Sequence, residues 1–370
     1  MKLVVGLAVL VAYVVLTTAL AHVLTWPVAV AAAPPTIERP PARPGHARLL
    51  FLGDTGLGDR AQALLDARGY DAPFERTRWL VESADVAVAN LEMPITEHRR
   101  RFAMYKRWRY ASSPRAALAL ASAGLDVVTL ANNHSTDQDD EGLFDTLRLS
   151  RAAGLEPMGA GSNEEEARRG LVIRVGDVNV GVLAYCERQL WWEVWDDQFA
   201  RRSRPGVAAL TDAGLAADIA RLRPLVDVLV VTLHIGYNYE APTEDTLRWS
   251  RRAIDLGADL VVDHHPHSSH PIALHRGRPI ALSLGNFVFG TPGHRELDVG
   301  QMLFVELDGK RLARLEVLPL DVQNNRVAFV PRPLVGAPLD AALSSLIRES
   351  AAYGAAMHRE ADRAVLELAP

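Results

Sequence analysis

From residue 47 onward, short apolar runs alternate with segments in which apolar residues recur every three or four positions. The short runs are typical of buried strands, and the periodic segments are typical of amphipathic helices. The predicted strands are 48–52, 85–89, 127–131, 171–175, 178–184, 226–233, 260–262, 280–284, 302–307 and 312–318. The predicted helices are 59–68, 74–83, 114–123, 141–153, 211–222, 243–256 and a long C-terminal amphipathic helix at 341–368. This alternation predicts an α/β fold.

The first 45 residues have a different pattern. Residues 3–24 are almost entirely apolar or small, and as a helix they would extend over about 33 Å, enough to cross a bilayer. Because small residues suited to cleavage follow at 29–33, residues 1–33 are predicted to be either a signal anchor or a cleaved signal peptide. Either alternative places the rest of the chain on the extracytoplasmic side of the cell membrane. Residues 34–45, with five prolines, are predicted to be an extended linker, followed by one domain at 46–335 and the C-terminal helix at 336–370.

Composition narrows the possible chemistry. The chain has 370 residues, is 49% hydrophobic and carries a net charge of −5, which argues against disorder and against a nucleic-acid partner. A single cysteine, Cys186, excludes an internal disulfide framework and a cysteine-based zinc site. Of twelve histidines, six fall between His234 and His275.

Polar side chains of the kinds that bind metals or move protons stand at the ends of five predicted strands. They are Asp54, Glu92, Asn133 with His134, His234, and His265 with His267. Each residue taken alone also suits a helix cap, a turn or a surface charge. Together they indicate a site, because ligands of α/β sheets bind beyond the carboxyl ends of the strands.

The donors in this set are carboxylate, amide and imidazole groups, which favour Mn, Fe or Zn over Ca. About six ligands suit one divalent ion, or two ions roughly 3.5–4 Å apart that together activate a water molecule. The two imidazoles of His265-Pro266-His267 could chelate one ion or bridge two. His134, beside Asn133, is predicted to stabilise the transition state or to protonate a leaving group.

At these motifs the sequence resembles the capsule-synthesis CapA family of the poly-γ-glutamate system, a branch of the calcineurin-like metallophosphoesterase superfamily. The resemblance extends from about Arg48 to Gly290. The matching stretches are Leu52-Gly53-Asp54, Ala89-Asn90-Leu91-Glu92, Leu130-Ala131-Asn132-Asn133-His134 with Asp137, His234-Ile235-Gly236, Gly257-Ala258-Asp259-Leu260-Val261-Val262, His265-Pro266-His267 and Ser283-Leu284-Gly285-Asn286-Phe287-Val288-Phe289.

The resemblance implies a four-layer α/β/β/α sandwich of the metallophosphatase type with an N-terminal membrane segment. It implies Asp54, Glu92, Asn133, His234, His265 and His267 as metal positions and His134 as the catalytic residue. Asn132, Asp137 and Asn286 of the same motifs are expected to bind substrate. The implied partners are an anionic cell-surface polymer or its precursor, other capsule-synthesis proteins, and the membrane through the N-terminus.

The chain departs from the superfamily pattern in several places. Gly56 stands where the first motif has a second ligand histidine, and Asn90-Leu91-Glu92 replaces a Gly-Asp pair that bridges both metals. Asn238 replaces a usual glutamate. Asp139 and Asp263 replace glycines, and Asp263 either shifts its loop or adds a carboxylate near the site.

Three functions therefore stay open: a metal-dependent hydrolase or transferase acting on a phosphoester or a polymer amide, a non-catalytic component that tethers or exports the polymer, and a general periplasmic phosphodiesterase or nucleotidase. Two further features have open interpretations: a basic run that suits either a polyanionic chain or a solvated edge strand, and three tryptophans that suit a substrate groove, the membrane surface or packing of a loop on the core. They are the basic run of Arg99, Arg100, Arg101, Lys106, Arg107 and Arg109, and the tryptophans Trp191, Trp192 and Trp195. His264, His270 and His275 are interpreted as bystanders.

Overall fold

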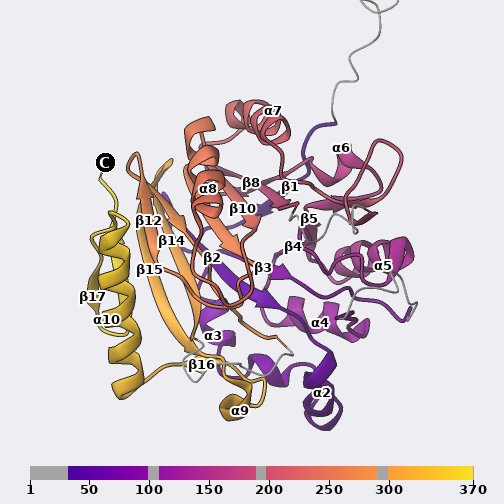
Figure 1. The fold of residues 1–370 in the computed structure, drawn as a ribbon, viewed down its shortest axis with the longest axis horizontal. Helices are drawn as coiled ribbons and strands as arrows, with labels where there is room; N and C mark the ends of the chain where they lie inside the picture. Colours follow the sequence, from indigo (N-terminus) through magenta and orange to yellow (C-terminus); the bar gives the residue numbers. More distant parts are fainter. Residues whose placement is uncertain (1–31, 99–107, 189–196, 290–298, 370) are drawn as a thin grey trace, which may run out of the picture. The chain divides into compact units, whose positions relative to one another are not determined.

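Two β-sheets form the framework of the structure, a computed structural model that describes residues 32–98, 108–188, 197–289 and 299–369 (Figure 1). The strands of sheet A, in spatial order, are β1 (Thr36–Arg39), β7 (Leu171–Val175), β8 (Val178–Cys186), β10 (Val228–His234), β11 (Leu260–His264), β13 (Arg278–Ala281) and β12 (Ile272–His275). Those of sheet B are β17 (His358–Glu360), β18 (Arg363–Glu367), β15 (Arg311–Asp321), β14 (Val299–Asp308), β2 (His46–Thr55), β3 (Val86–Leu91), β4 (Val127–Thr129) and β5 (Glu156–Met158), with β16 (Arg332–Pro333) beside β15. A small separate sheet pairs β6 (Ala160–Gly161) with β9 (Gly206–Val207).

Each main sheet has a parallel half. In sheet A, β8, β10 and β11 run parallel, and in sheet B so do β2, β3, β4 and β5. Parallel strands present their carboxyl ends at one edge of a sheet, so the polar residues that follow them converge there.

Alternation along the strands of sheet A separates two apolar clusters. On β10, Val228 and Val230 belong to the cluster that includes β2, β3 and β4 of sheet B. Leu229 and Val231 belong to a second cluster, which includes α7 and α8. Because successive side chains of a strand point to opposite faces, one face of sheet A packs towards sheet B and the other packs under helices.

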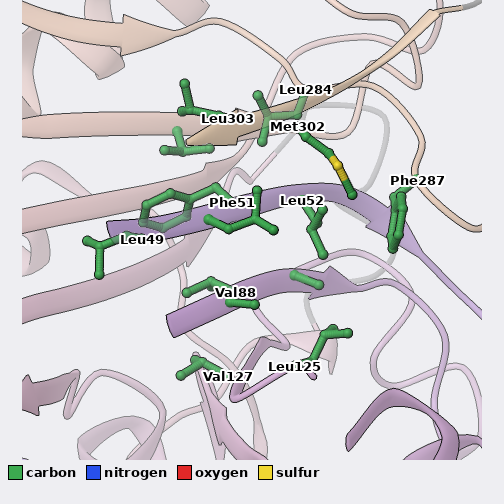
Figure 2. Close-up of a cluster of buried hydrophobic side chains, with 14 of the residues drawn as sticks. Leu49, Phe51, Leu52, Val88, Leu125, Val127, Leu284, Phe287, Met302 and Leu303 are labelled. Carbon is green, nitrogen blue, oxygen red and sulfur yellow. The ribbon is translucent and has the colours of Figure 1, made fainter. Parts of the chain in front are cut away.

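The central strands of sheet B are buried on both faces. Leu49, Phe51 and Leu52 of β2 lie with Val88 of β3 and Leu303 of β14 in the same core (Figure 2). A run of consecutive apolar residues is what a strand covered on both sides requires, and this explains why the sequence pattern located these strands.

Helices cover the outer faces of both sheets. Their bounds are α2 (Gln62–Arg68), α3 (Arg78–Val81), α4 (Arg115–Ser122), α5 (Asp139–Ala152), α6 (Glu164–Ala167), α7 (Asp212–Leu222), α8 (Glu244–Leu256), α9 (Asn324–Val327) and α10 (Gly336–Ala352), with short 3₁₀ turns at Asp59–Ala61, Ala72–Phe74 and Arg223–Leu225. Apolar residues of α7 and α8 pack on sheet A, and those of α4 and α5 belong to the cluster that contains β3 and β4. The mixed α/β fold predicted from the sequence is confirmed.

The structure corrects the linker prediction. Thr36–Arg39 forms β1 and pairs in parallel with β7, and Arg39 Nε lies 2.6 Å from Asp126 Oδ1. Prolines flank this strand, and proline is tolerated at a sheet edge because the missing N–H is not needed there. Residues 36–39 are therefore part of sheet A rather than a spacer.

The predicted C-terminal helix is also wrong beyond residue 352. Helix α10 ends at Ala352, Gly354 adopts a φ of +83°, and the chain then forms β17 and β18. Glycine with a positive φ commonly follows a helix end. The buried Ala364, Val365 and Leu366 complete sheet B against β15, a long-range pairing that local periodicity does not reveal.

The described helices include none that is both long and apolar enough to cross a membrane. The predicted anchor at residues 3–24 lies outside the described residues.

Candidate functional site

The strand ends deliver the predicted ligand positions to one place. Asp54 is the penultimate residue of β2, Glu92 directly follows β3, and His234 is the last residue of β10. Asn133 and His134 follow β4, while His265 and His267 follow β11. His234 has the same parity as Val228 and Val230, so its imidazole lies on the face of sheet A that packs towards sheet B.

A close backbone contact places Asp54 beside Asn286. The Asp54 amide donates to the Gly285 carbonyl at 2.9 Å, and the Phe287 amide donates to the Asp54 carbonyl at 2.9 Å. A Cβ on Gly53 would lie 2.1 Å from the Gly285 oxygen, so this approach requires glycine at position 53. The motif that contains Gly285 and Asn286 is thereby held against the end of β2.

The first group of donors consists of Glu92, His234 and His265. His234 Nε2 lies 3.4 Å from Glu92 Oε1 and 3.0 Å from His265 Nδ1. The side-chain oxygen of Asn133 lies 2.9 Å from the same His234 nitrogen. One carboxylate, two imidazoles and one amide oxygen therefore meet at this point.

The second group consists of Asp54, Glu92 and His267. His267 Nδ1 lies 3.1 Å from Asp54 Oδ2, and His267 Nε2 lies 3.8 Å from Glu92 Oε1. Asn286 Oδ1 is 2.9 Å from His267 Nδ1. Glu92 belongs to both groups, and His265 and His267 belong to different groups. The geometry therefore favours two adjacent centres over chelation of one ion by both histidines.

Burial controls the charges of these donors. Burial raises the pKa of Asp54, but hydrogen bonds to His264 and His267 outweigh it, and the pKa lies well below the ordinary range. Burial and then the neighbouring His265 hold the pKa of His234 well below its ordinary value. Burial and then His267 lower the pKa of His265 to about 3. At neutral pH, Asp54 is ionised and His234 and His265 are neutral.

This donor set fits a divalent cation. Metal ligands must be deprotonated carboxylates and neutral imidazoles, and the pKa shifts supply both. The two groups combine oxygen and nitrogen donors with no thiolate, a chemistry that suits Mn, Fe or Zn. Asp54 and Glu92 have no exposed surface, so a cation between them would compensate two buried charges.

His134 forms a pair with Asp137 beside these groups. His134 Nδ1 lies 2.7 Å from Asp137 Oδ2, and the same oxygen accepts the Tyr110 backbone N–H at 2.8 Å. The Tyr110 ring packs on His134 with centroids 4.5 Å apart. A carboxylate at Nδ1 fixes the tautomer and leaves Nε2 for proton transfer. The structure thus places Asp137 against His134, and the expected substrate-binding role of Asp137 stays a prediction.

Asn132 lies just before this pair and is almost fully buried. Its Oδ1 accepts the backbone N–H groups of His134 and Ser135 at 3.0 Å each. Its Nδ2 donates to the Leu91 carbonyl at 2.8 Å and to Asn90 Oδ1 at 3.1 Å. The side-chain amide thus joins the His134 turn to the end of β3, and a role in substrate binding stays a prediction for Asn132 and Asn286.

His264 and Asp263, which precede His265, differ from what the sequence suggested: the histidine lies at the site and the aspartate does not. His264 Nδ1 lies 3.6 Å from Asp54 Oδ1, so His264 is not a bystander. Asp263 points the other way and accepts from Ser250 Oγ of α8 at 2.7 Å, so it adds no carboxylate to the site. Strand alternation could have revealed this, since His264 shares parity with Leu260 and Val262, which face sheet B.

The remaining residues that the sequence analysis discussed lie outside the site or outside the described residues, and one residue of the site was not predicted. His270 bonds the Leu282 carbonyl at 3.3 Å and His275 pairs with Asp255 at 2.8 Å, as suits residues outside the site. Asn90, which donates to Asp54, was missed by the sequence analysis. The residues 99–107 of the basic run and the three tryptophans lie outside the described residues.

Comparison with known proteins identifies relatives at the level of sequence. Residues 48–291 match the family model described as "Bacterial capsule synthesis protein PGA_cap". The chain is 28% identical over 285 residues to the PGA biosynthesis protein CapA of Bacillus subtilis, covering 76% of this chain and 73% of that protein. It is 33% identical over 263 residues to a probable polyglutamine synthesis accessory protein of Mycobacterium tuberculosis, covering 66% and 68%.

Solved structures are more distant. The calcineurin-like phosphoesterase YfkN from Bacillus subtilis matches with a TM-score of 0.41 and 14% identity, covering 75% of this chain and 85% of that one. A chain from Staphylococcus aureus matches with a TM-score of 0.44 and 14% identity, covering 74% of this chain and 54% of that one. The purple acid phosphatase PPD1 from yellow lupin matches with a TM-score of 0.31 and 8% identity, covering 75% of this chain and 52% of that one. At these scores the solved structures do not indicate what this chain does.

Proposed function

The chain belongs to the bacterial capsule synthesis family PGA_cap, and we propose that it is a metal-dependent hydrolase or transferase in the synthesis of a poly-γ-glutamate-like cell-surface polymer. The observation that carries this proposal is the pair of buried donor groups that share Glu92, with the His134–Asp137 pair beside them. A protein that only tethers a polymer has no need of such a cluster, because buried charges are costly unless something compensates them.

The two donor groups would bind cations, and His134 would transfer a proton. Asp54, His267 and Glu92 would hold one divalent cation, and Glu92, His234 and His265 a second, with Asn133 and Asn286 as additional oxygen donors. Bound cations supply positive charge that polarises a phosphoryl or carbonyl oxygen and activates water. Asp137 orients His134, whose Nε2 delivers a proton to the leaving group.

The substrate class follows from this charge distribution. Two cations facing a proton donor suit an anionic phosphoester, or an amide within an anionic polymer, because both develop negative charge on an oxygen during cleavage. The relatives named for PGA, capsule or polyglutamine synthesis support the polymer or its precursor as the partner. We propose that residues 1–33 attach the protein to the cell membrane with the catalytic domain on the extracytoplasmic side, which protease digestion of intact cells would test.

Activity measurements on the purified chain test the enzyme. Bis(p-nitrophenyl) phosphate reports phosphodiester cleavage, poly-γ-glutamate reports amide cleavage, and both are assayed with Mn²⁺. We expect His134→Ala to lower the rate by about 10²–10⁴-fold with bound metal unchanged, because it removes only the proton donor. His275→Gln, at an ion pair away from the donor groups, is the matched control and retains full activity. A His134→Ala rate equal to that of the unmodified chain would refute the role of His134.

One observation favours the non-catalytic alternative. Gly56 stands where the superfamily has a ligand histidine, and an added Cβ there would lie 2.9 Å from Met93 Cε and 3.0 Å from Met93 Cβ, so a side chain would require Met93 to move. A protein that binds Mn²⁺ yet cleaves neither substrate would establish a polymer-binding component. Cleavage of nucleotides in preference to both substrates would instead indicate a nucleotidase.

A further inference from the structure

Two buried carboxamides connect the donor groups to the turn that contains His134. Asn90 and Asn132 are each only 1% exposed, and Asn132 Nδ2 donates to Asn90 Oδ1 at 3.1 Å. Asn90 lies on β3 opposite Asp54 of β2 on one side and Thr129 of β4 on the other. The pair therefore spans the carboxyl ends of three adjacent strands.

Backbone groups fix the orientation of Asn132. Two backbone N–H groups, those of His134 and Ser135, point at one end of its side-chain amide, so this end must be the acceptor oxygen. The other end is then the NH₂ group, which faces two acceptors, the Leu91 carbonyl and Asn90. Since Leu91 presents a carbonyl, turning the Asn132 amide over would lose hydrogen bonds at both ends.

The orientation of Asn90 follows from that of Asn132. Asn90 Oδ1 accepts from Asn132 Nδ2 and also from Thr129 Oγ1 at 3.3 Å. Its NH₂ group must therefore face the donor groups, where it donates to Asp54 Oδ1 at 2.7 Å. The same nitrogen lies 3.3 Å from His234 Nδ1. Asn90 thus contacts one member of each donor group, Asp54 of one and His234 of the other.

The amide at position 90 stabilises the ionised form of Asp54 without adding charge. A neutral donor 2.7 Å from a buried carboxylate stabilises its charged form. A carboxylate at position 90 would instead place a second negative charge at this distance from Asp54. Residue 90 therefore orients a predicted ligand and places no second negative charge beside it.

We propose that Asn132 and Asn90 form a carboxamide relay, in which the backbone of the His134 turn orients Asp54 through two side-chain amides. Both asparagines are positioning residues, since the oxygen of Asn90 accepts from Asn132 and Thr129 and the amide of Asn132 is engaged by Leu91, Asn90 and the His134 turn. The relay rests on the proposed cation binding, because Asp54 is the ligand that it orients. It makes the positions of His134 and of the cation ligands depend on one another.

Calorimetric titration of the purified full-length chain with Mn²⁺ tests the relay. Asn90→Leu keeps the size of the side chain and removes both amide groups, and we expect Mn²⁺ affinity to fall about 10–100-fold, as for other residues that orient metal ligands. Thr129→Val is the matched control, because it removes a buried hydrogen bond to Asn90 but leaves the relay intact. Its affinity should remain within threefold of the unmodified chain.

Asn132→Asp provides a second variant that preserves the turn. Aspartate keeps the oxygen that accepts from His134 and Ser135 but presents a second oxygen, not NH₂, to Asn90. Asn90 must then turn over and place its own oxygen against Asp54, and we expect at least a tenfold loss of Mn²⁺ affinity. This variant decides the question if Asn90→Leu does not fold, as judged by circular dichroism.

The outcomes separate the relay from the proposed function. Tight Mn²⁺ binding by the unmodified chain, with affinities within threefold for folded Asn90→Leu and for Asn132→Asp, would overturn the relay alone. No Mn²⁺ binding by the unmodified chain would overturn the proposed function and the relay with it. A loss in Thr129→Val equal to that in Asn90→Leu would also overturn the relay, since general loosening of the core would then explain both.

Discussion

The buried carboxyl of Asp263 predicts a specific pH dependence of stability. Its side chain has no exposed surface and lies on the face of β11 that packs against α8. Burial raises the pKa of Asp263 to about 8, the Ser250 hydrogen bond opposes the rise, and the charge of Glu187 adds to it. An unfolded aspartate has a pKa of about 3.9. Between these values the folded chain holds a proton that the unfolded chain has released.

The sign and size of the effect follow from that difference. Because the folded state binds more protons between about pH 4 and about pH 8, its stability falls as the pH rises through this window. Each pH unit costs up to about 1.4 kcal/mol, so the interval from pH 5 to pH 8 costs at most about 4 kcal/mol. The side-chain amide of an Asp263→Asn variant cannot ionise. We therefore expect the variant to gain about 2–4 kcal/mol relative to the unmodified chain over this interval.

Urea unfolding followed by circular dichroism measures this difference, with a chelator present so that bound cations do not contribute. At a slope of about 3 kcal/mol per molar urea, a gain of about 2 kcal/mol moves the midpoint by roughly 0.7 M. Asp177→Asn, in the exposed turn between β7 and β8, is the control and should show no such change with pH. A difference between Asp263→Asn and the unmodified chain that is constant from pH 5 to pH 8 would refute the reasoning.

Four further substitutions test the site and the backbone around it. Glu92→Ala should abolish binding of both cations, and Asp54→Ala should abolish binding of one, as measured by the metal content per chain. Equal losses of metal in the two variants would show that Glu92 is not shared between the donor groups. Gly53→Ala should lower the free energy of unfolding by at least about 2–3 kcal/mol, because its Cβ would meet the Gly285 oxygen at 2.1 Å; an unchanged melting temperature would contradict this. Asp139→Gly should raise the free energy of unfolding by about 0.5–1 kcal/mol, because Asp139 adopts a φ of +62° that glycine adopts at lower cost. A lower melting temperature of this variant would contradict the prediction.

The elements that the sequence located are those whose burial is visible locally. Strands β2, β3 and β10 are continuous apolar runs because they are covered on both faces. The strands predicted at 171–175 and 178–184 are β7 and β8, which pair as a hairpin around Gly176-Asp177, a dipeptide typical of such turns. Local chemistry was sufficient in each case, since no distant residue had to be known.

The elements that were missed depend on distant partners. β1 is stabilised by β7, and β18 by β15, across about 130 and about 40 intervening positions. Proline content in one case and alanine content in the other favoured different local structures, and tertiary pairing prevailed. Composition alone therefore misassigned both ends of the described chain.

The residues of the candidate site also differ in how far the sequence could predict them. Residues after a strand end could be predicted, because the carboxyl edge of a parallel sheet collects them. Asn90 and His264 also stand at strand ends, as the penultimate residue of β3 and the last residue of β11, but singling them out requires knowing which side chains of these strands face the other sheet. His264 could have been found from its parity with Val262. Asn90 could not, because its role depends on Asn132 and Asp54, which approach it from neighbouring strands.

The backbone conformation at His265-Pro266-His267 explains why the sequence could not decide between one and two cation sites. His265 and His267 adopt φ values of +100° and +56°, a region that costs a residue other than glycine about 1–3 kcal/mol. No local rule predicts such values, and with ordinary φ values the two imidazoles would not take these directions. The surrounding chain imposes them, since the Ile235 amide binds the His264 carbonyl at 3.0 Å and the Tyr239 amide binds the Pro266 carbonyl at 2.7 Å. The strained turn places the centroids of the two rings 6.1 Å apart, with one ring in each donor group.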